Sequence, residues 1–218
     1  MALLVHIRHW VVEPWLDRFR RLAPDLAVID ARAPFDPAAV RWAAVWRPEP
    51  GALAALPNLE AIFNLGAGVD ALMADPTLPD VPIVRIVDPD LTARMTEWVV
   101  MNVLTHHRRA ALFRDQQTRA EWRSQRQPAA RAVRVGIMGM GVLGRDAAEV
   151  LVRLGFDVAG WGRTEQTVPG VAMYAGADQL DAFLGRTDIL VVLLPATAET
   201  RGILNRGLFA KLARENHM

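Results

Sequence analysis

The stretch VRVGIMGMGVLG, residues 133–144, joins a short apolar run to three glycines spaced as G-x-G-x-x-G. Between a predicted strand and a predicted helix, this spacing is typical of a turn that binds the pyrophosphate of a dinucleotide. Gly139 would permit the tight turn, Gly141 would let the backbone approach the phosphates, and Gly144 would let the helix pack closely on the strand. Unpaired N–H groups at the helix N-terminus would then face the phosphates. The alternative is a glycine-rich strand–helix turn without a ligand.

The next predicted strand, within GFDVAGWGRT at residues 155–164, ends in glycine instead of an acidic residue. In dinucleotide sites an Asp or Glu at this position binds the adenosine ribose 2′-OH. Gly162 omits that carboxylate, while Arg163 and Thr164 add a positive charge and a hydroxyl that suit a 2′-phosphate. We therefore predict that NADP(H) is preferred over NAD(H). The alternative is a solvated loop arginine, because Lys211 is the only lysine and 25 − 1 = 24 of the basic residues are arginine.

Strand and helix patterns alternate along the chain, which predicts an α/β fold with parallel sheets covered by helices. Strands are expected at 3–7, 26–30, 43–46, 59–65, 81–87, 133–138, 156–161 and 188–194, and helices at 14–22, 36–43, 91–109, 143–154, 178–185 and 199–213. A Gly/Pro-marked connection is expected between the strand at 156–161 and the helix at 178–185. The basic run at 109–134 is interpreted as a solvated helix and linker, with a subunit contact as the alternative. The shift in composition there predicts a domain boundary.

Composition excludes several classes of function. The chain of 218 residues is 52% hydrophobic and 22% charged, as in globular proteins, and its net charge of +1 does not indicate a nucleic-acid or membrane partner. It has no cysteine, which excludes disulfides and thiolate chemistry. No apolar run is long enough to span a membrane, and the N-terminus lacks the order of a signal peptide, so a cytoplasmic location is expected. Adjacent His106 and His107 point apart on a helix, and no metal site is predicted.

Three stretches together resemble the D-isomer-specific 2-hydroxyacid dehydrogenases, particularly the glyoxylate/hydroxypyruvate reductase A branch. They are NLGAGVD at 64–70, VGIMGMGVLG at 135–144 with GWGRT at 160–164, and RTDILVVLLPATAETRGILN at 186–205. The resemblance implies a flavodoxin-like substrate domain followed by a doubly wound Rossmann nucleotide-binding domain. We expect residues 1–100 to form the substrate-binding domain, 101–132 an interdomain helix and basic arm, and 133–218 the NAD(P)-binding domain.

The resemblance also implies an activity and its site residues. The family transfers a hydride from NAD(P)H to a small 2-oxo acid, such as glyoxylate or hydroxypyruvate, giving the D-2-hydroxy acid. Backbone N–H groups around Ala67 and Gly68 would hold the substrate carboxylate. On the residues alone, the alternative is a strand-end turn with Asp70 capping the next helix. The amides of Val142 and Leu143 would face the pyrophosphate, and the nicotinamide end would be bordered by Leu194, Pro195 and Thr200.

The family's catalytic arginine, glutamate and histidine would lie beyond residue 218, so the resemblance implies a C-terminally truncated member with an incomplete Rossmann domain. His6, His9, His106, His107 and His217 do not match the family's proton donor, and the catalytic residues stay unassigned. The alternative function is a non-catalytic NADP(H)-binding module or inactive fragment. The resemblance further implies a homodimer that uses the long helix and basic arm, with Trp122 as a contact.

Overall fold

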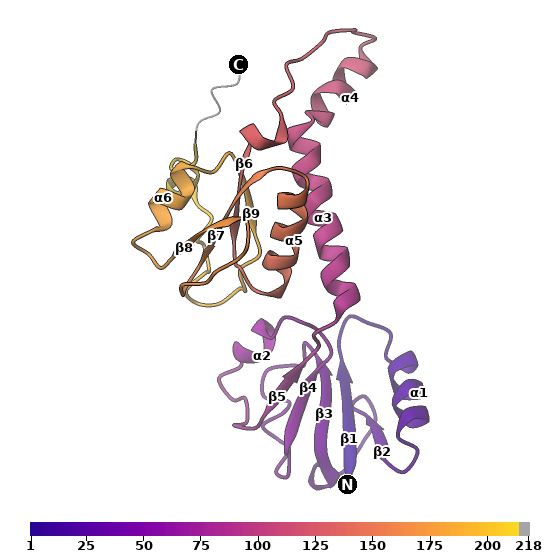
Figure 1. Cartoon of the computed structure of the whole chain (residues 1–218). Coiled ribbons are helices and arrows are strands. Elements are labelled where there is room, and N and C mark those ends of the chain that lie inside the picture. The colour runs from indigo at the N-terminus through magenta and orange to yellow at the C-terminus, as the bar shows by residue number, and fades with distance from the viewer. Residues whose placement is uncertain (214–218) are drawn as a thin grey trace. The chain divides into compact units, whose positions relative to one another are not determined.

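The computed structural model describes residues 1–213 and divides into two compact units, Met1–Asp88 and the chain from Pro89 onward (Figure 1). His217 and the rest of the C-terminal RENHM stretch, residues 214–218, lie outside the described residues. Among residues 1–213 no helix combines the length and hydrophobicity that a membrane crossing needs. The boundary expected at residue 100 falls inside helix α3, which groups entirely with the second unit.

The first unit is a parallel sheet of strand order β2-β1-β3-β4-β5, the flavodoxin-like order that was predicted. Side chains alternate across the sheet: Leu3 and Val5 pack with α1 on one face, and Leu4 packs with α2 on the other. The elements are β1 (Ala2–Ile7), α1 (Glu13–Leu22), β2 (Ala27–Asp30), η1 (Pro37–Ala39), β3 (Val40–Trp46), β4 (Ala61–Asn64), α2 (Asp70–Met73) and β5 (Ile83–Arg85).

The second unit is a parallel sheet of order β8-β7-β6-β9, which matches the first four strands of the doubly wound nucleotide-binding order. Its elements are α3 (Pro89–His107), α4 (Ala110–Thr118), η2 (Ala130–Ala132), β6 (Arg134–Met138), α5 (Val142–Arg153), β7 (Asp157–Gly162), β8 (Val171–Ala175), α6 (Leu180–Gly185), β9 (Ile189–Val192) and α7 (Arg206–Phe209). The α/β class and the Rossmann-type unit expected from the sequence are therefore confirmed.

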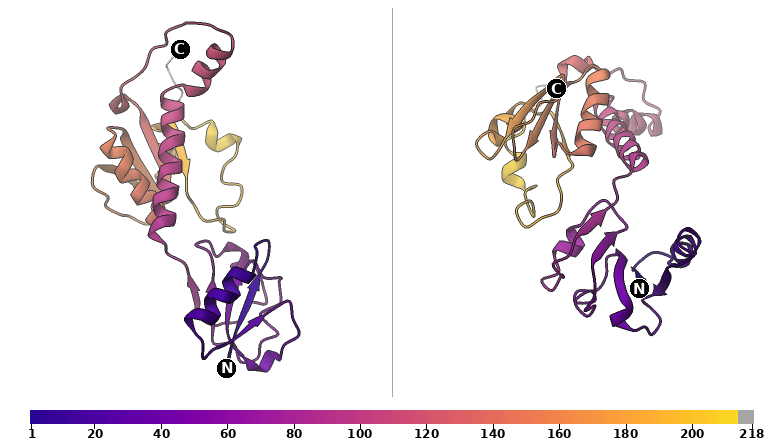
Figure 2. Two further views of the ribbon diagram at one scale, coloured as in Figure 1. Left: turned by 90° about the vertical axis from the view of Figure 1, so that its right-hand side faces the viewer. Right: turned by 60° about the horizontal axis from the view of Figure 1, so that its bottom comes forward.

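Helix α3 lies alongside α5 in Figure 1 and in the left view of Figure 2, where α3 is magenta and α5 orange. Buried Val99 and Val103 of α3 join the apolar cluster that contains Ala148 of α5. The buried hydroxyl of Thr96 donates a hydrogen bond to the carboxylate of Asp146 on α5. Packing on α5 explains why the whole of α3 belongs to the second unit.

Three expected elements were wrong. The helix expected at 36–43 is replaced by the short η1 followed by β3. The Asp36 side chain accepts a hydrogen bond from the Ala38 N–H, and β3 already begins at Val40. The connection after β7 contains a further strand, β8, which pairs with β7 along its whole length. The helix expected at 199–213 is reduced to α7, which the Asn205 side chain caps by accepting from the Leu208 N–H. In each case local turn or pairing geometry overrides the hydrophobic pattern.

Gly136 in the central strand β6 is a strict packing constraint. A Cβ at this position would lie 2.7 Å from Thr187 Cγ2 and 2.8 Å from Phe183 Cζ, and both of those residues are buried.

We predict that Gly136→Ala lowers the free energy of unfolding by about 1–3 kcal/mol, the usual cost of overpacking a core. Denaturant unfolding measures the change. Gly185→Ala is the matched control, since a Cβ at Gly185 meets nothing within 4 Å; an equal loss in both variants would contradict the packing argument.

His107 at the end of α3 makes stability depend on pH. Its ring packs edge-on against Phe156 with 5.1 Å between centroids, and its buried Nδ1 has no hydrogen-bond partner among the described residues. Burial, with a smaller contribution from the charge of Arg108, lowers the pKa of His107 below its ordinary 6.5. A lowered pKa means that the unfolded chain binds the proton more readily, so stability is complete above pH 6.5 and falls as the pH drops below it.

We predict that His107→Phe flattens this part of the pH profile, because phenylalanine keeps the aromatic contact with Phe156 and carries no titrating group. The measurement is urea unfolding of both chains at several pH values between about 5 and 7.5. Parallel profiles for the two chains would show that His107 does not contribute.

Candidate functional site

The glycine turn after β6 is held between two neighbouring strands. The N–H of Gly139 donates to the Trp161 carbonyl on β7 at 2.9 Å, and the Leu193 N–H donates to the Met138 carbonyl at 2.8 Å. Gly139 has a φ of 101°, and a Cβ there would lie 2.7 Å from the carbonyl group of Leu193. Only glycine fits this backbone without displacing the chain that leaves β9.

The other two glycines have opposite surroundings. A Cβ at Gly144, in the first turn of α5, would fall within contact distance of the Gly139 carbonyl, 3.0 Å from its carbon. Gly144 therefore lets α5 start directly against the turn. A Cβ at Gly141 would meet nothing within 4 Å, so the space above this residue is open in the protein. The first and third glycines close the turn, while the second leaves room beside it.

The N-terminus of α5 faces this open space. Gly141 is its N-cap and supplies no side-chain hydrogen bond, and the first turn contains no acidic residue. Val142 is exposed and Leu143 is partly exposed at the same turn. The first N–H groups of a helix have no partner within the helix, and the helix dipole places partial positive charge there. The turn therefore has the physical properties of an anion site.

The end of β7 is followed by a positive charge, and glycine occupies position 162, where dinucleotide sites have an acidic residue. Gly162 is buried, whereas Arg163 and Thr164 that follow it are exposed. A Cβ at Gly162 would lie 3.6 Å from Gln166 Nε2, so the chain after β7 folds back over the strand end. A hydrogen bond from the Thr197 side chain lowers the pKa of Glu199, and the positive charge of Arg163 lowers it further by a smaller amount. Arg163, in the chain after β7, therefore lies close enough to Glu199, in the chain after β9, for their charges to interact.

Sequence reasoning missed a second arginine beside this strand end. The Arg145 guanidinium donates from Nη2 to Gln166 Oε1 at 2.7 Å and from Nε to the Met140 carbonyl at 3.1 Å. It thus joins the glycine turn to the loop after β7. Residues 145 and 166 are far apart in sequence, and no local pattern indicates their contact.

The chain leaving β9 forms a pocket of about 400 Å³ that brings together Leu194, Pro195 and Thr200, the three residues predicted at the nicotinamide end. The Thr200 hydroxyl donates to the Pro195 carbonyl and accepts from the Thr197 N–H at 2.8 Å. Its hydrogen bonds are therefore used to shape the loop. The N-terminal end of this loop lies beside Gly139, because a Cβ at that glycine would meet the Leu193 carbonyl and, at 3.0 Å, the Leu194 nitrogen.

In the first unit, the NLGAGVD loop follows β4 and is shaped by Asn64, which sequence reasoning did not single out. Its buried side-chain amide donates to the carbonyls of Gly66 at 2.7 Å and Gly68 at 2.8 Å. With these carbonyls turned inward, Ala67 is partly exposed and Gly68 is exposed. Helix α2 starts at Asp70 without a side-chain cap, so the capping alternative for this loop is not observed. The asparagine directly before a glycine-rich turn is the one signal in the sequence, and only the structure shows that its side chain is buried.

Trp46, at the end of β3, packs against this loop. Its ring occupies the space that a side chain at position 66 would need. An ideal Cβ at Gly66 would lie 2.9 Å from the Trp46 Cε3 atom. The Trp46 ring also stacks with Trp10, with 4.5 Å between the ring centroids. Gly66 is thus required for close packing, while the exposed part of the loop is formed by Ala67 and Gly68.

Two of the described histidines have structural contacts. His6 Nε2 lies 2.5 Å from a carboxylate oxygen of Glu49, and His107 packs on Phe156. Within residues 1–213 no group of three or more His, Asp or Glu side chains is arranged to hold a metal. The catalytic residues of the sequence prediction therefore stay unassigned.

Comparison with known proteins relates this geometry to one family. The family model described as D-isomer specific 2-hydroxyacid dehydrogenase, NAD binding domain, matches residues 100–218. A curated glyoxylate/hydroxypyruvate reductase A from Serratia proteamaculans is 39% identical over 98% of this chain and 70% of its own length. For the reductase A of Yersinia enterocolitica the identity is 40%, and the match spans 56% of that protein. The chain thus spans only part of the length of the curated relatives it matches.

Two solved structures are similar over nearly the whole chain. An NADPH-dependent glyoxylate/hydroxypyruvate reductase from Sinorhizobium meliloti, in complex with NADP and sulfate, has a TM-score of 0.88 and 44% identity, covering 99% of this chain and 69% of that one. A probable 2-hydroxyacid dehydrogenase from Rhizobium etli, in complex with NADP, HEPES and tartaric acid, has a TM-score of 0.90 and 42% identity over the same shares. The chain belongs to the D-isomer-specific 2-hydroxyacid dehydrogenase family.

Proposed function

We propose that this chain binds NADPH and forms part of a reductase that converts a small 2-oxo acid into the D-2-hydroxy acid. The observation that carries the proposal is the pairing of an open glycine turn at the α5 N-terminus with a β7 end that has Gly162 and Arg163 in place of a carboxylate. When bound, the cofactor supplies the hydride for the reduction. The chain's own residues bind and orient its phosphates.

The charges at the β7 end favour NADP(H) over NAD(H). A carboxylate at position 162 would accept hydrogen bonds from a free ribose 2′-OH and would repel a 2′-phosphate. Glycine removes that repulsion, and the exposed Arg163 guanidinium offers a planar, permanently charged donor group. The Sinorhizobium and Rhizobium relatives, whose structures contain NADP, support the same preference.

The NLGAGVD loop is the proposed binding site for the substrate carboxylate. Asn64 turns the Gly66 and Gly68 carbonyls toward itself, which leaves the backbone around Ala67 and Gly68 accessible to a small anion. The names of the curated relatives point to glyoxylate or hydroxypyruvate as substrates. Turnover of either acid with NADPH supports the reductase, whereas cofactor binding without turnover supports the alternative of a non-catalytic NADP(H)-binding module.

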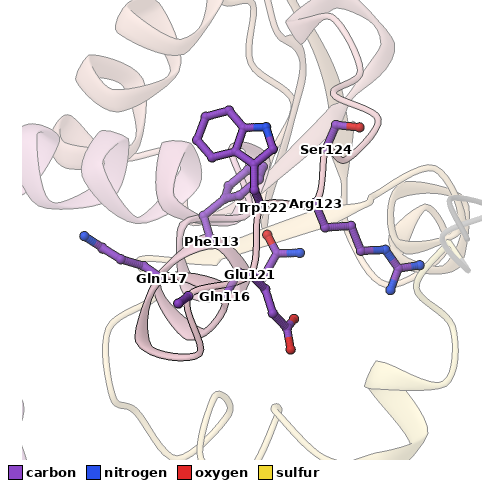
Figure 3. Close-up of a pocket in the computed structure, with 8 residues that line it drawn as sticks. Phe113, Gln116, Gln117, Glu121, Trp122, Arg123 and Ser124 are labelled. Carbon is purple, nitrogen blue, oxygen red and sulfur yellow. The ribbon is translucent and has the colours of Figure 1, made fainter.

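We also propose a cytoplasmic homodimer that uses the arm after α3. Helix α4 and the chain that follows form a pocket of about 580 Å³ within the second unit, and Figure 3 shows the side chains that line it. Phe113 is partly exposed there, and Trp122 is fully exposed. Aromatic side chains and arginines such as Arg123 are enriched at protein interfaces, and a second copy of the chain would cover this apolar surface.

Gly141 tests the anion site without disturbing the fold. We predict that Gly141→Ala leaves the unfolding midpoint nearly unchanged, because a Cβ there meets nothing in the protein. The same methyl group would occupy the space proposed for the pyrophosphate, so NADPH affinity should fall by at least about tenfold, the loss expected when a charge-assisted hydrogen bond is broken. Gly144→Ala is the comparison variant and should lower both the midpoint and the affinity. Unchanged NADPH binding by Gly141→Ala would place the phosphates elsewhere.

Arg163 tests the cofactor preference. We predict that Arg163→Ala weakens NADPH binding by about 1.5–3 kcal/mol, the range for hydrogen bonds to charged groups, and leaves NADH binding nearly unchanged. The dissociation constants come from titrations that follow the tryptophan fluorescence, to which Trp161 at the β7 end contributes. An equal loss for both cofactors would mean that Arg163 does not recognise the 2′-phosphate.

A further inference from the structure

Arg145 connects the two segments that border the proposed ribose site. It lies in the first turn of α5, and Gln166 lies four residues after Gly162. The Arg145 guanidinium donates to the Met140 carbonyl within the glycine turn and to the Gln166 side-chain oxygen in the loop after β7. One side chain therefore fixes the distance between the phosphate-binding turn and the end of β7.

The positive charge of Arg145 is not neutralised by these contacts. Both acceptors, a backbone carbonyl and a side-chain amide, are neutral, and the ion pairs found among residues 1–213 do not include Arg145. Other arginines of this unit are engaged differently: Arg134 pairs with Asp188 at 2.6 Å and Arg186 with Asp157 at 2.6 Å. Two N–H groups of Arg145 are used in its hydrogen bonds, which leaves donors for an anion.

Gln166 connects the charge of Arg145 to position 162, where other dinucleotide sites carry an acidic residue. An ideal Cβ at Gly162 lies 3.6 Å from Gln166 Nε2, and the other side-chain amide atom, Oε1, bonds Arg145. An acidic side chain at position 162 would extend toward Gln166, the partner of Arg145, and would bring a negative charge near the guanidinium. With glycine there, no carboxylate from β7 competes with a negatively charged group of the ligand for Arg145.

We propose that Arg145 is a second specificity-determining residue, which receives the 2′-phosphate of NADPH opposite Arg163, and that Gln166 is the positioning residue that holds Arg145 there. This inference rests on the proposed function. The two arginines differ in how they act. Arg163 is exposed at the tip of the strand, whereas Arg145 is already oriented by two hydrogen bonds, so it loses less side-chain entropy when the phosphate binds.

The test compares NADPH and NADH binding in the full chain and in three variants. Arg145→Met keeps the aliphatic part of the side chain, Gln166→Glu adds a carboxylate that pairs with Arg145, and Arg153→Met removes an exposed arginine from the last turn of the same helix. Arg145→Met should weaken NADPH at least about tenfold and NADH less than about twofold. Gln166→Glu should also lower the NADPH-to-NADH preference, by neutralising Arg145 and repelling the phosphate. Arg153→Met should change neither.

The outcomes separate this inference from the function on which it rests. If the unmodified chain prefers NADPH and Arg163→Ala reduces that preference, but Arg145→Met and Gln166→Glu leave it unchanged, the role of Arg145 is refuted and the proposed function stands. Equal weakening of both cofactors by Arg145→Met would assign it a purely structural role and also overturn the inference. If Arg145→Met fails to fold, Arg145→Lys keeps a positive charge at the site and should retain only part of the preference for NADPH over NADH. An unchanged preference for NADPH over NADH, or a complete loss of NADH binding, would contradict the proposal.

Discussion

The close approach of three backbone segments at the glycine turn is the constraint on which the second unit depends. Gly139 lies against the chain leaving β9, and Gly144 lets α5 begin against Gly139 itself. Met138 pairs with Trp161 on β7 and with Val192 on β9, so the three strands end at one level. Because parallel strands present their carboxyl ends at the same edge, this meeting point positions every segment of the proposed cofactor site.

The same packing explains how a site for a negatively charged ligand forms with few charged side chains. The α5 N-terminus contributes its N–H groups and dipole, and the open space at Gly141 makes them accessible. In the proposed site, charged side chains are needed at the β7 end, where Arg163 and Arg145, together with Gly162 and Gln166, would determine which ribose is accepted. On this proposal, affinity for the dinucleotide and preference for its phosphorylated form would reside in different parts of the site.

Much of this could be predicted from sequence because it is local. The glycine spacing, the apolar strands and the acid-free end of β7 are each contained in a short stretch of residues, and they indicated the fold class and the cofactor site together. The missed features depend on distant residues. Strand β8 is stabilised by pairing with β7, and Arg145 meets Gln166 across 21 positions. Asn64 was missed because its role depends on burial, which its residue type does not reveal.

The central claim is that residues of this chain form a binding site that distinguishes a 2′-phosphate. Calorimetric titration of the unmodified chain with NADPH and, separately, with NADH tests this claim most directly. We expect saturable binding of both cofactors with NADPH bound at least about tenfold more tightly, as is usual when a charged hydrogen bond is gained. Equal affinity for the two cofactors, or tighter binding of NADH, would contradict the assignment of the β7 end as a phosphate site.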